Sequence, residues 1–346
     1  MADTIAITGA SGKLGGATLS ALLAHNLVPP SSIVALTSSS PGSPTWASLA
    51  AKGVQVRHAA FESPATFDEA LKGVTKLFLV SSPHVALDFG DEDEVPDGRG
   101  REAHHRGAID AAVRAAVPHV YYSSLAFGWD AATQSPGRTS RAGVMRAHLR
   151  TEAYLARLVA DGALPRATLL REGLYNESWP LYLGYFDVDA GADKAEVEVE
   201  VPLAGDGPVC WTAIADLGVA SALVLAAPGA EYAGRTLYLS TRPTRARTLA
   251  DVARLVGEAR GKEVRVKKVG ADEHERYYVQ RRGKEAPAVR WWVGTYAALE
   301  DGECAPDDPT LERLLASVGV EATPVEECIR AMVRRELAGS KIFGLQ

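Results

Sequence analysis

The amino-acid sequence predicts an α/β protein built on a doubly wound parallel sheet. In the first 172 residues, short β-rich apolar runs alternate with stretches whose apolar residues recur at helical spacing. The apolar runs are continuous, which indicates strands buried on both faces, as in parallel sheets. Because the connections between parallel strands are right-handed, the intervening helices are expected to cover both faces of the sheet.

Six strands are expected in this first part, over residues 4–8, 32–37, 54–58, 76–81, 119–124 and 166–170. The helices between them are expected over residues 15–25, 64–72, 101–116 and 141–159. Pro118 ends the third of these helices, because proline lacks the backbone N–H that a helix interior needs. This strand-and-helix order is typical of a doubly wound sheet.

The pattern changes after about residue 172, where aromatic side chains become dense. Later helices are expected over residues 211–225, 249–259, 311–318 and 324–337, and later strands over 236–240 and 263–269. We therefore predict two parts, a sheet domain over residues 1–172 and a smaller substrate-facing α/β lobe over residues 173–346. Segments near residues 205–240 are expected to return to the sheet.

The composition excludes several classes of partner. Net charge is −6 and no block of Lys and Arg occurs, so nucleic acid is not an expected partner. No apolar stretch approaches the roughly 20 residues of a membrane span, and no secretory signal pattern stands at residue 1. The three cysteines are far apart and fit no metal-site spacing. Reduced thiols and a cytoplasmic location are therefore expected.

A glycine-rich loop, TGASGKLG, joins the first expected strand to the first expected helix at residues 8–15. In such a loop one glycine allows a tight turn, another lets backbone N–H groups approach a pyrophosphate, and a third lets helix and strand pack closely. The helix N-terminus adds a partial positive charge. We therefore expect the loop to contact a dinucleotide through Gly9, Ser11, Gly12, Lys13, Leu14 and Gly15.

The residues after the second strand indicate which dinucleotide binds. NAD sites usually place an acidic residue there to bind the ribose 2′-hydroxyl. This chain has no acidic residue between Asp3 and Glu62, and offers Thr37, Ser38 and Ser39 instead. Hydroxyls, together with Lys13, suit a 2′-phosphate that a carboxylate would repel. NADP(H) is therefore the predicted cofactor.

The ends of the fourth and fifth strands supply further candidate contacts. Ser81, Ser82 and Pro83 end one strand, and Ser123 and Ser124 end the next. Ligands of open α/β sheets bind beyond the carboxyl ends of the strands, so these residues are expected near the nicotinamide. The alternatives are a simple strand-ending turn and serines buried in the sheet.

Several segments together resemble the NmrA-like family of atypical short-chain dehydrogenases/reductases. They are the glycine loop, VRHAAF at 56–61, HRGAIDAA at 105–112, VYYSS at 120–124 and LREGLY at 170–175. The resemblance implies a Rossmann-like sheet, NADP(H) binding with Phe61 and Tyr175 among the contacts, and activities like those of type 2 quinone oxidoreductases and triphenylmethane reductase.

Three features depart from the family pattern. Thr and Ser replace the Arg expected after the second strand, Glu172 stands where Asn is common, and the segment 88–100 is longer than usual. That acidic, glycine-rich segment follows the fourth strand, so it is either a mobile lid over the ligand or a solvated loop.

No tyrosine in the chain has a lysine four residues later, so the Tyr-Lys pair of typical short-chain dehydrogenases is missing. At the corresponding helix, His148 and Glu152 share one face. A nearby carboxylate would raise the pKa of the histidine and allow an imidazolium to donate a proton. The alternatives are a cofactor-side or helix-packing histidine with no proton role, and a plain exposed helix carboxylate. His104 and His105 point about 100° apart, so no metal site is predicted.

Three functions follow from these observations. The first is an NADPH-dependent reductase of a quinone or other flat conjugated acceptor, a small-molecule substrate. The second is a non-catalytic NADP(H)-binding redox sensor that controls a partner protein. The third is a reductase or isomerase of fungal secondary metabolism. An aromatic cluster either walls a substrate pocket or packs in a core; its members are Tyr175, Trp179, Tyr182, Tyr185 and Phe186. A homodimer is an assembly that the sequence leaves open.

Overall fold

The computed structural model describes residues 3–90, 95–188 and 200–334. Its centre is a seven-stranded parallel sheet in the order β10-β8-β5-β4-β1-β2-β3. The strands are β1 (Ile5–Ile7), β2 (Ile33–Thr37), β3 (Gln55–His58), β4 (Lys76–Val80), β5 (His119–Leu125), β8 (Arg166–Glu172) and β10 (Thr236–Leu239). The predicted doubly wound parallel sheet is confirmed.

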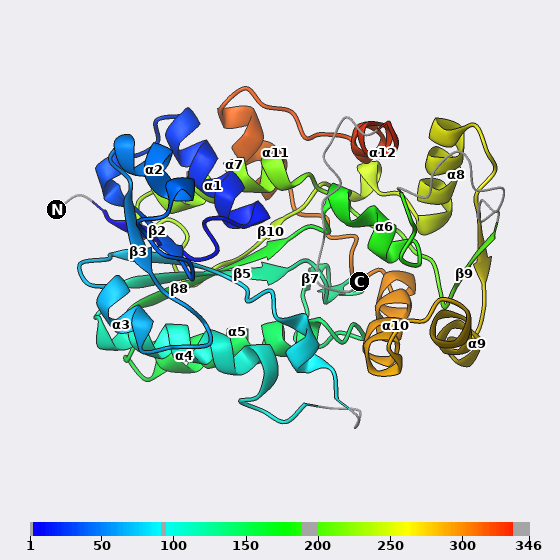
Figure 1. Cartoon of the computed structure of the whole chain (residues 1–346), viewed down its shortest axis with the longest axis horizontal. Helices are drawn as coiled ribbons and strands as arrows, with labels where there is room; N and C mark the ends of the chain where they lie inside the picture. Colours follow the sequence, from blue (N-terminus) through cyan, green and yellow to red (C-terminus); the bar gives the residue numbers. More distant parts are fainter. Residues whose placement is uncertain (1–2, 91–94, 189–199, 335–346) are drawn as a thin grey trace.

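Helices cover both faces of this sheet (Figure 1). One face carries α1 (Lys13–Ala24), α2 (Pro44–Ala51), α7 (Ile214–Ala226) and α11 (Thr310–Ser317). The other carries α3 (Thr66–Ala70), α4 (Gly100–Arg114) and α5 (Met145–Ala160). Helices α1 and α7 pack very closely, since a Cβ on Gly218 would lie 2.6 Å from Cβ of Ala17. The short helix α2 was not expected from the sequence.

The second lobe lies beyond the carboxyl ends of the strands (Figure 1). It contains α6 (Trp179–Tyr182), β9 (Glu200–Leu203), α8 (Leu249–Arg260), β11 (Arg265–Lys268), α9 (Ala271–Arg276), α10 (Ala286–Glu300) and α12 (Val325–Val333). Strands β9 and β11 pair in parallel, and a small antiparallel pair joins β6 (Trp129–Asp130) to β7 (Ser135–Pro136). After this lobe has begun, the chain returns to the sheet through α7, β10 and α11.

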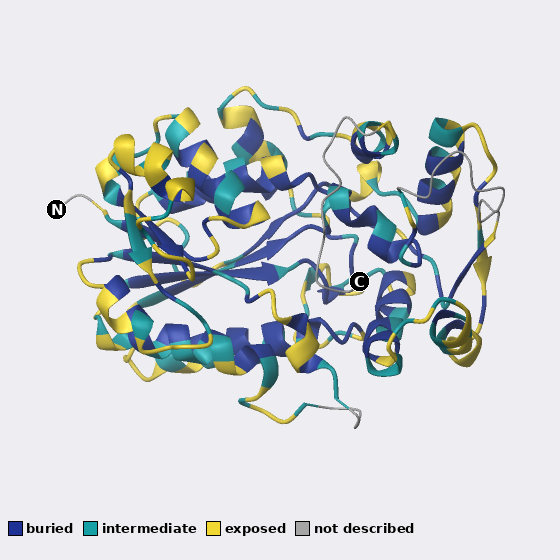
Figure 2. Cartoon of the chain, viewed as in Figure 1, coloured by how far each residue is buried: buried dark blue, intermediate teal, exposed yellow. Residues whose placement is uncertain are grey.

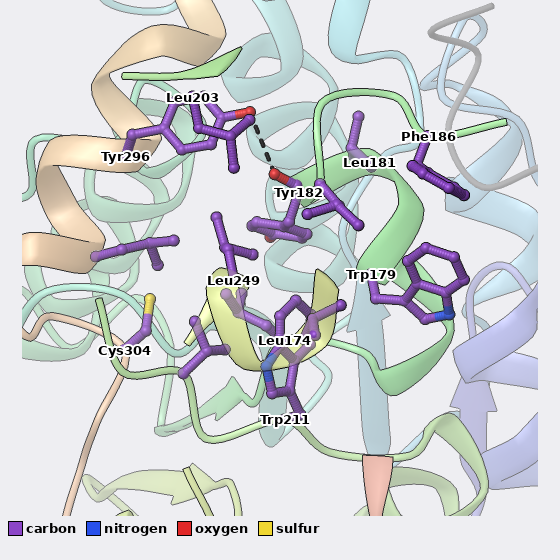
Figure 3. Packing of buried hydrophobic residues seen from close by; sticks show 14 of the residues in the cluster. Leu174, Trp179, Leu181, Tyr182, Phe186, Leu203, Trp211, Leu249, Tyr296 and Cys304 are labelled. Carbon is purple, nitrogen blue, oxygen red and sulfur yellow. Dashed lines mark hydrogen bonds between the residues drawn. The ribbon is translucent and has the colours of Figure 1, made fainter. Parts of the chain in front are cut away.

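Separate hydrophobic cores fill the two faces of the sheet and the second lobe. The central strands are buried along their length (Figure 2). In the second lobe the aromatic side chains pack together, and the Tyr296 hydroxyl donates a hydrogen bond to the Tyr182 carbonyl at 3.2 Å (Figure 3). No helix among the described residues is long and apolar enough to cross a membrane.

The strand order places a switch point at the centre of the sheet. From β1 the chain moves outward to β2 and β3, and then returns to β4 on the other side of β1. The loops that follow β1 and β4 therefore diverge at the carboxyl edge and leave a crevice between them. The glycine loop follows β1, and Ser81 follows β4.

Candidate functional site

A cavity of about 380 Å³ lies at this switch point. The sheet contributes the glycine loop (Gly9, Gly12, Lys13, Leu14, Gly15) and the ends of two strands (Ser81, Ser82, Pro83, Ser123, Ser124). The helices contribute Arg101 and His148, and the second lobe contributes Leu174, Tyr175, Leu181, Tyr182, Trp291 and Trp292. The cavity therefore joins the sheet domain to the second lobe.

At two positions of the glycine loop, Gly9 and Gly15, the backbone conformation or the space available favours glycine. Gly9 has a φ of +60°, and its carbonyl accepts a 2.7 Å hydrogen bond from the Gly12 N–H. A Cβ on Gly15 would lie only 2.4 Å from the Gly9 carbonyl oxygen. Gly12 caps α1 without a side chain, so no capping side chain competes for the N–H groups of the first turn. The loop fits the pyrophosphate of a dinucleotide.

The hydroxyls after β2 form a small polar cluster of their own. Thr37 Oγ1 lies 2.9 Å from Ser39 Oγ, which also accepts a 3.2 Å hydrogen bond from Trp46 Nε1. Ser38 is exposed beside them. These residues do not line the cavity, and their proposed contact with a 2′-phosphate stays a prediction. The sequence interpretation missed Trp46 because α2 itself was missed.

Three other predicted cofactor residues differ in their surroundings. Lys13 lines the cavity, where partial burial lowers its pKa to about 8 against the opposing effect of Glu177. No contact within the described ranges joins Lys13 to the Thr37 cluster, so its assignment to the 2′-phosphate stays a prediction. Ser11 is exposed on the loop. Phe61 stacks on His104, with ring centroids 5.8 Å apart and planes 9° apart.

The expected pairing of His148 with Glu152 is wrong. Glu152 is buried and accepts hydrogen bonds from Arg171 Nε at 3.0 Å, Arg171 Nη2 at 2.7 Å and Ser124 Oγ at 2.6 Å. Glu152 is therefore neither the partner of His148 nor an exposed carboxylate. Burial lowers the pKa of His148 well below its ordinary value, and the positive charge of Arg101 lowers it further. An imidazolium proton donor at neutral pH does not follow from this environment.

A chain of hydrogen bonds fixes the position of the proton on His148. The Ser82 backbone N–H donates to His105 Nε2 at 3.0 Å, so the proton of His105 is on Nδ1, which donates to Thr151 Oγ1 at 2.9 Å. The Tyr122 hydroxyl lies 3.2 Å from His105 Nδ1, but it cannot donate there because that nitrogen already carries a proton. It therefore donates to His148 Nδ1, 3.0 Å away. His148 then carries its proton on Nε2. The neutral ring is a hydrogen-bond donor at the cavity wall.

Arg101 is a cavity residue that the sequence interpretation missed. Its Nε donates to Asp88 Oδ2 at 2.6 Å, and its Nη2 donates to the Val144 carbonyl at 3.0 Å. Asp88 Oδ1 also accepts the Arg101 backbone N–H at the start of α4. Arg101 therefore anchors Asp88, the first residue of the segment 88–100, to the start of α4. Residues 91–94 lie outside the described residues, so the suggested lid stays a prediction.

Glu172 lies at the end of β8 with no exposed surface. Its Oε2 accepts hydrogen bonds from Ser123 Oγ at 3.0 Å and from Tyr175 Oη at 3.5 Å, while Oε1 has no hydrogen-bond partner among the described residues. Burial raises the pKa of Glu172 well above its ordinary value, against the weaker opposing effect of the two hydroxyls. Burial therefore favours the neutral form of the Glu172 carboxyl group. Ser123 and Tyr175 connect it to the cavity.

The far wall of the cavity is apolar and aromatic. From the predicted aromatic cluster, Tyr175 and Tyr182 line the cavity. The other members pack in the core of the second lobe; they are Trp179, Tyr185 and Phe186. Helix α10 completes the wall with Trp291 and Trp292. The sequence interpretation missed this helix, although the Trp291-Trp292 pair was a visible signal.

Comparison with known proteins agrees with this geometry. The model of the NmrA-like family matches residues 1–281. The chain is 29% identical over 332 residues to an NmrA-like family domain-containing oxidoreductase from Aspergillus flavus, covering 94% of each chain. It is 34% identical over 262 residues to quinone oxidoreductase 2 from Escherichia coli, covering 75% of this chain and 76% of that protein.

Solved structures are similar over nearly the whole chain. The NADPH complex of the E. coli quinone oxidoreductase matches with a TM-score of 0.71 and 28% identity, covering 94% of this chain and 98% of that one. Triphenylmethane reductase from Citrobacter sp., crystallised with NADP(H), matches with a TM-score of 0.69 and 26% identity, covering 96% and 100%. With the family model matched over most of its length, this chain belongs to the NmrA-like family.

Proposed function

We propose that this chain is an NADP(H)-dependent oxidoreductase that reduces a quinone or another flat conjugated acceptor. The observation that carries the proposal is the two-sided cavity. One side combines the glycine loop with hydrogen-bonding groups, and the other is a wall of aromatic and aliphatic side chains. Predominantly apolar pockets with a few convergent polar groups are typical of sites for small organic ligands.

The glycine loop would hold the dinucleotide through the backbone of Gly9, Gly12 and the first turn of α1. When bound, the reduced nicotinamide supplies a hydride to the acceptor. The absence of an acidic residue after β2 and the hydroxyls of Thr37 and Ser39 support NADP(H) over NAD(H). The complexes of the E. coli and Citrobacter relatives with NADP(H) support the same choice.

The second lobe would hold the acceptor against its aromatic wall. Tyr182 and Trp292 pack edge to face, with ring centroids 5.0 Å apart, so their positions are mutually fixed. On the opposite side, His148 offers a neutral N–H to an acceptor oxygen. A hydrogen bond there stabilises the negative charge that develops on this oxygen during reduction. This role differs from the proton donation expected from the sequence.

The test is oxidation of NADPH by a panel of quinones, followed by absorbance. We expect turnover with at least one naphthoquinone, tighter binding of NADPH than of NADH in titrations, and a roughly tenfold or larger fall in kcat for His148→Ala. Stronger binding of NADH would overturn the cofactor assignment. An unchanged kcat in His148→Ala would remove the role of that histidine.

The alternative is a non-catalytic NADP(H)-binding regulator. Tight binding of NADPH without turnover of any acceptor in the panel would favour this alternative and overturn the reductase proposal. A matched control is available in His274, a buried histidine of the second lobe that does not line the cavity. His274→Ala should affect stability more than kcat.

A further inference from the structure

We propose that Glu172 is held as a neutral carboxylic acid and supplies, through the Ser123 hydroxyl, the proton that completes reduction of the acceptor. This inference rests on the reductase function proposed above and names the proton source for it. In this account Ser123 is the catalytic residue that contacts the acceptor, and Glu172 is the positioning residue behind it. Two observations carry the proposal: the geometry of Glu172, and the fact that no described residue places a cation beside it.

The position of Glu172 connects it to the cavity through a single hydroxyl. Ser123 Oγ is 3.0 Å from Glu172 Oε2, and Ser123 lines the cavity. Tyr175 Oη, at 3.5 Å, is a second but longer contact. Oε1 has no partner in the part of the chain that the structure describes, so the carboxyl is not held by the several donors that a buried carboxylate requires.

The groups that face Glu172 do not favour its ionised form. Those that lower its pKa are the hydroxyls of Ser123 on β5 and Tyr175 beyond β8, and their effect is smaller than that of burial. No charged side chain within the described ranges contributes to this pKa. Burial raises the pKa of Tyr175 well above its ordinary value, and Glu172, Tyr182 and Glu177 raise it further, so Tyr175 stays a neutral phenol.

His148 does not fill this role. Its ring is neutral, and Nε2–H is the only proton it could give to an acceptor. Loss of that proton would leave an imidazolate, which burial disfavours. His148 therefore stabilises charge by hydrogen bonding, and the transferred proton must come from a stronger acid. Glu172 is a protonated carboxyl group one hydroxyl away from the same cavity.

In the proposed step, each bond that breaks is matched by a bond that forms. A quinone receives a hydride with its electron pair from NADPH, which is oxidised to NADP⁺, and one quinone oxygen becomes an oxyanion. The Ser123 hydroxyl, which donates to Glu172 Oε2 in the structure, first rotates toward that oxygen, so that Ser123 Oγ accepts a hydrogen bond from the proton on Glu172 Oε2. The O–H bond of Ser123 then breaks as its proton forms a new O–H bond on the quinone oxygen. The Glu172 O–H bond breaks as its proton passes to Ser123 Oγ. Glu172 is left as a carboxylate, and a proton from solvent restores it after the hydroquinone leaves.

The kinetic test compares the full-length wild type with Glu172→Gln. This substitution keeps the size of the side chain and an acceptor for Ser123, but removes the transferable proton. We expect kcat to fall on the order of 10²-fold, with the quinone KM and the NADPH Kd changed less than about twofold. We also expect the wild-type kcat to fall as Glu172 ionises at alkaline pH, and this fall to be absent in the variant.

The matched control is Asp216→Asn. Asp216 is another buried carboxyl with a raised pKa, and it accepts hydrogen bonds from the backbone and hydroxyl of Thr323. It does not line the cavity. We expect Asp216→Asn to keep the wild-type kcat and its alkaline limb, which separates proton supply from a general effect of losing a buried acid.

A second readout needs no turnover. The folded-state pKa of Glu172 is above its ordinary value of 4.5, so its contribution to stability is complete below pH 4.5 and is lost as pH rises toward the folded-state value. Glutamine does not titrate. The urea midpoint of Glu172→Gln should therefore rise relative to wild type between pH 5 and pH 8.

The outcomes separate the two proposals. A wild type that turns over no quinone overturns the reductase function, and the relay with it. A wild type that turns over while Glu172→Gln keeps the same kcat and pH profile overturns the relay alone. A midpoint difference that stays constant with pH overturns the neutral state of Glu172. Reduced kcat with a widening midpoint difference supports the inference.

Discussion

Glu152 and Glu172 each accept a hydrogen bond from one of two adjacent serines at the end of β5, but among the described residues only Glu152 faces a cation. Glu152 binds Ser124 and both the Nε and Nη2 atoms of Arg171. Glu172 binds Ser123, has no cation beside it within the described residues, and leaves Oε1 without a partner. Two identical side chains, each within one hydroxyl of the same cavity, thus have opposite electrostatic surroundings.

The pleat of β8 explains the difference. Arg171 and Glu172 are consecutive residues of one strand, so their side chains point to opposite faces of the sheet. Arg171 reaches Glu152 on α5, whereas Glu172 lies on the face covered by α1 and α7. The sheet therefore separates a cation from the carboxyl that follows it in sequence. A buried carboxyl without a counter-ion stays protonated, and a buried pair stays charged.

Breaking the Glu152–Arg171 ion pair should have the largest effect on the free energy of unfolding. Glu152→Ala removes the carboxylate and leaves the Arg171 guanidinium buried without its partner. We expect a loss of about 3–5 kcal/mol in the free energy of unfolding, because an unpaired buried charge is strongly disfavoured. Urea denaturation at pH 7 measures it. A loss below about 1 kcal/mol would mean that Arg171 finds other partners. The ion pair with Arg171 would then not explain the difference between Glu152 and Glu172.

A matched pair of tyrosine substitutions should sharpen the comparison with smaller effects. Tyr238 Oη lies 2.8 Å from Arg171 Nη1, whereas Tyr175 Oη lies 3.5 Å from Glu172. We expect Tyr238→Phe to cost about 1.5–2 kcal/mol of unfolding free energy, as for hydrogen bonds to charged groups. Tyr175→Phe should cost about 0.5 kcal/mol or less, because its contact is long and uncharged. Equal costs in denaturation would contradict the assigned charges.

Much of the fold could be predicted from local sequence patterns. Buried parallel strands appear in the sequence as continuous apolar runs. The glycines of the loop predict its backbone conformation, since Gly9 has a positive φ and Gly15 leaves no space for a Cβ. Helix α2 was missed because only Trp46 of its eight residues is buried, so no apolar face repeats at helical spacing. Helix α10 was missed although Pro287 stands in its first turn.

The chemistry of the site could be predicted only in part, because it depends on contacts between distant residues. His148 and Glu152 do share a face of α5, but what each contacts is set by other elements. Burial keeps His148 neutral and Tyr122 on β5 occupies its Nδ1, while Arg171 on β8 pairs with Glu152. The spacing of His148 and Glu152 along one helix predicts neither of these contacts. Glu172 was visible as a departure from the family pattern, yet its lack of a counter-ion depends on the pleat of β8.

The most direct test of this account is an infrared difference spectrum between the wild type and Glu172→Gln at pH 7, in the C=O stretching region of protonated carboxyl groups. We expect a band in the wild type that is lost in Glu172→Gln and kept in Glu152→Gln. Loss of an ionised carboxylate band in Glu172→Gln, with no change in the protonated region, would show that Glu172 is charged and would contradict it.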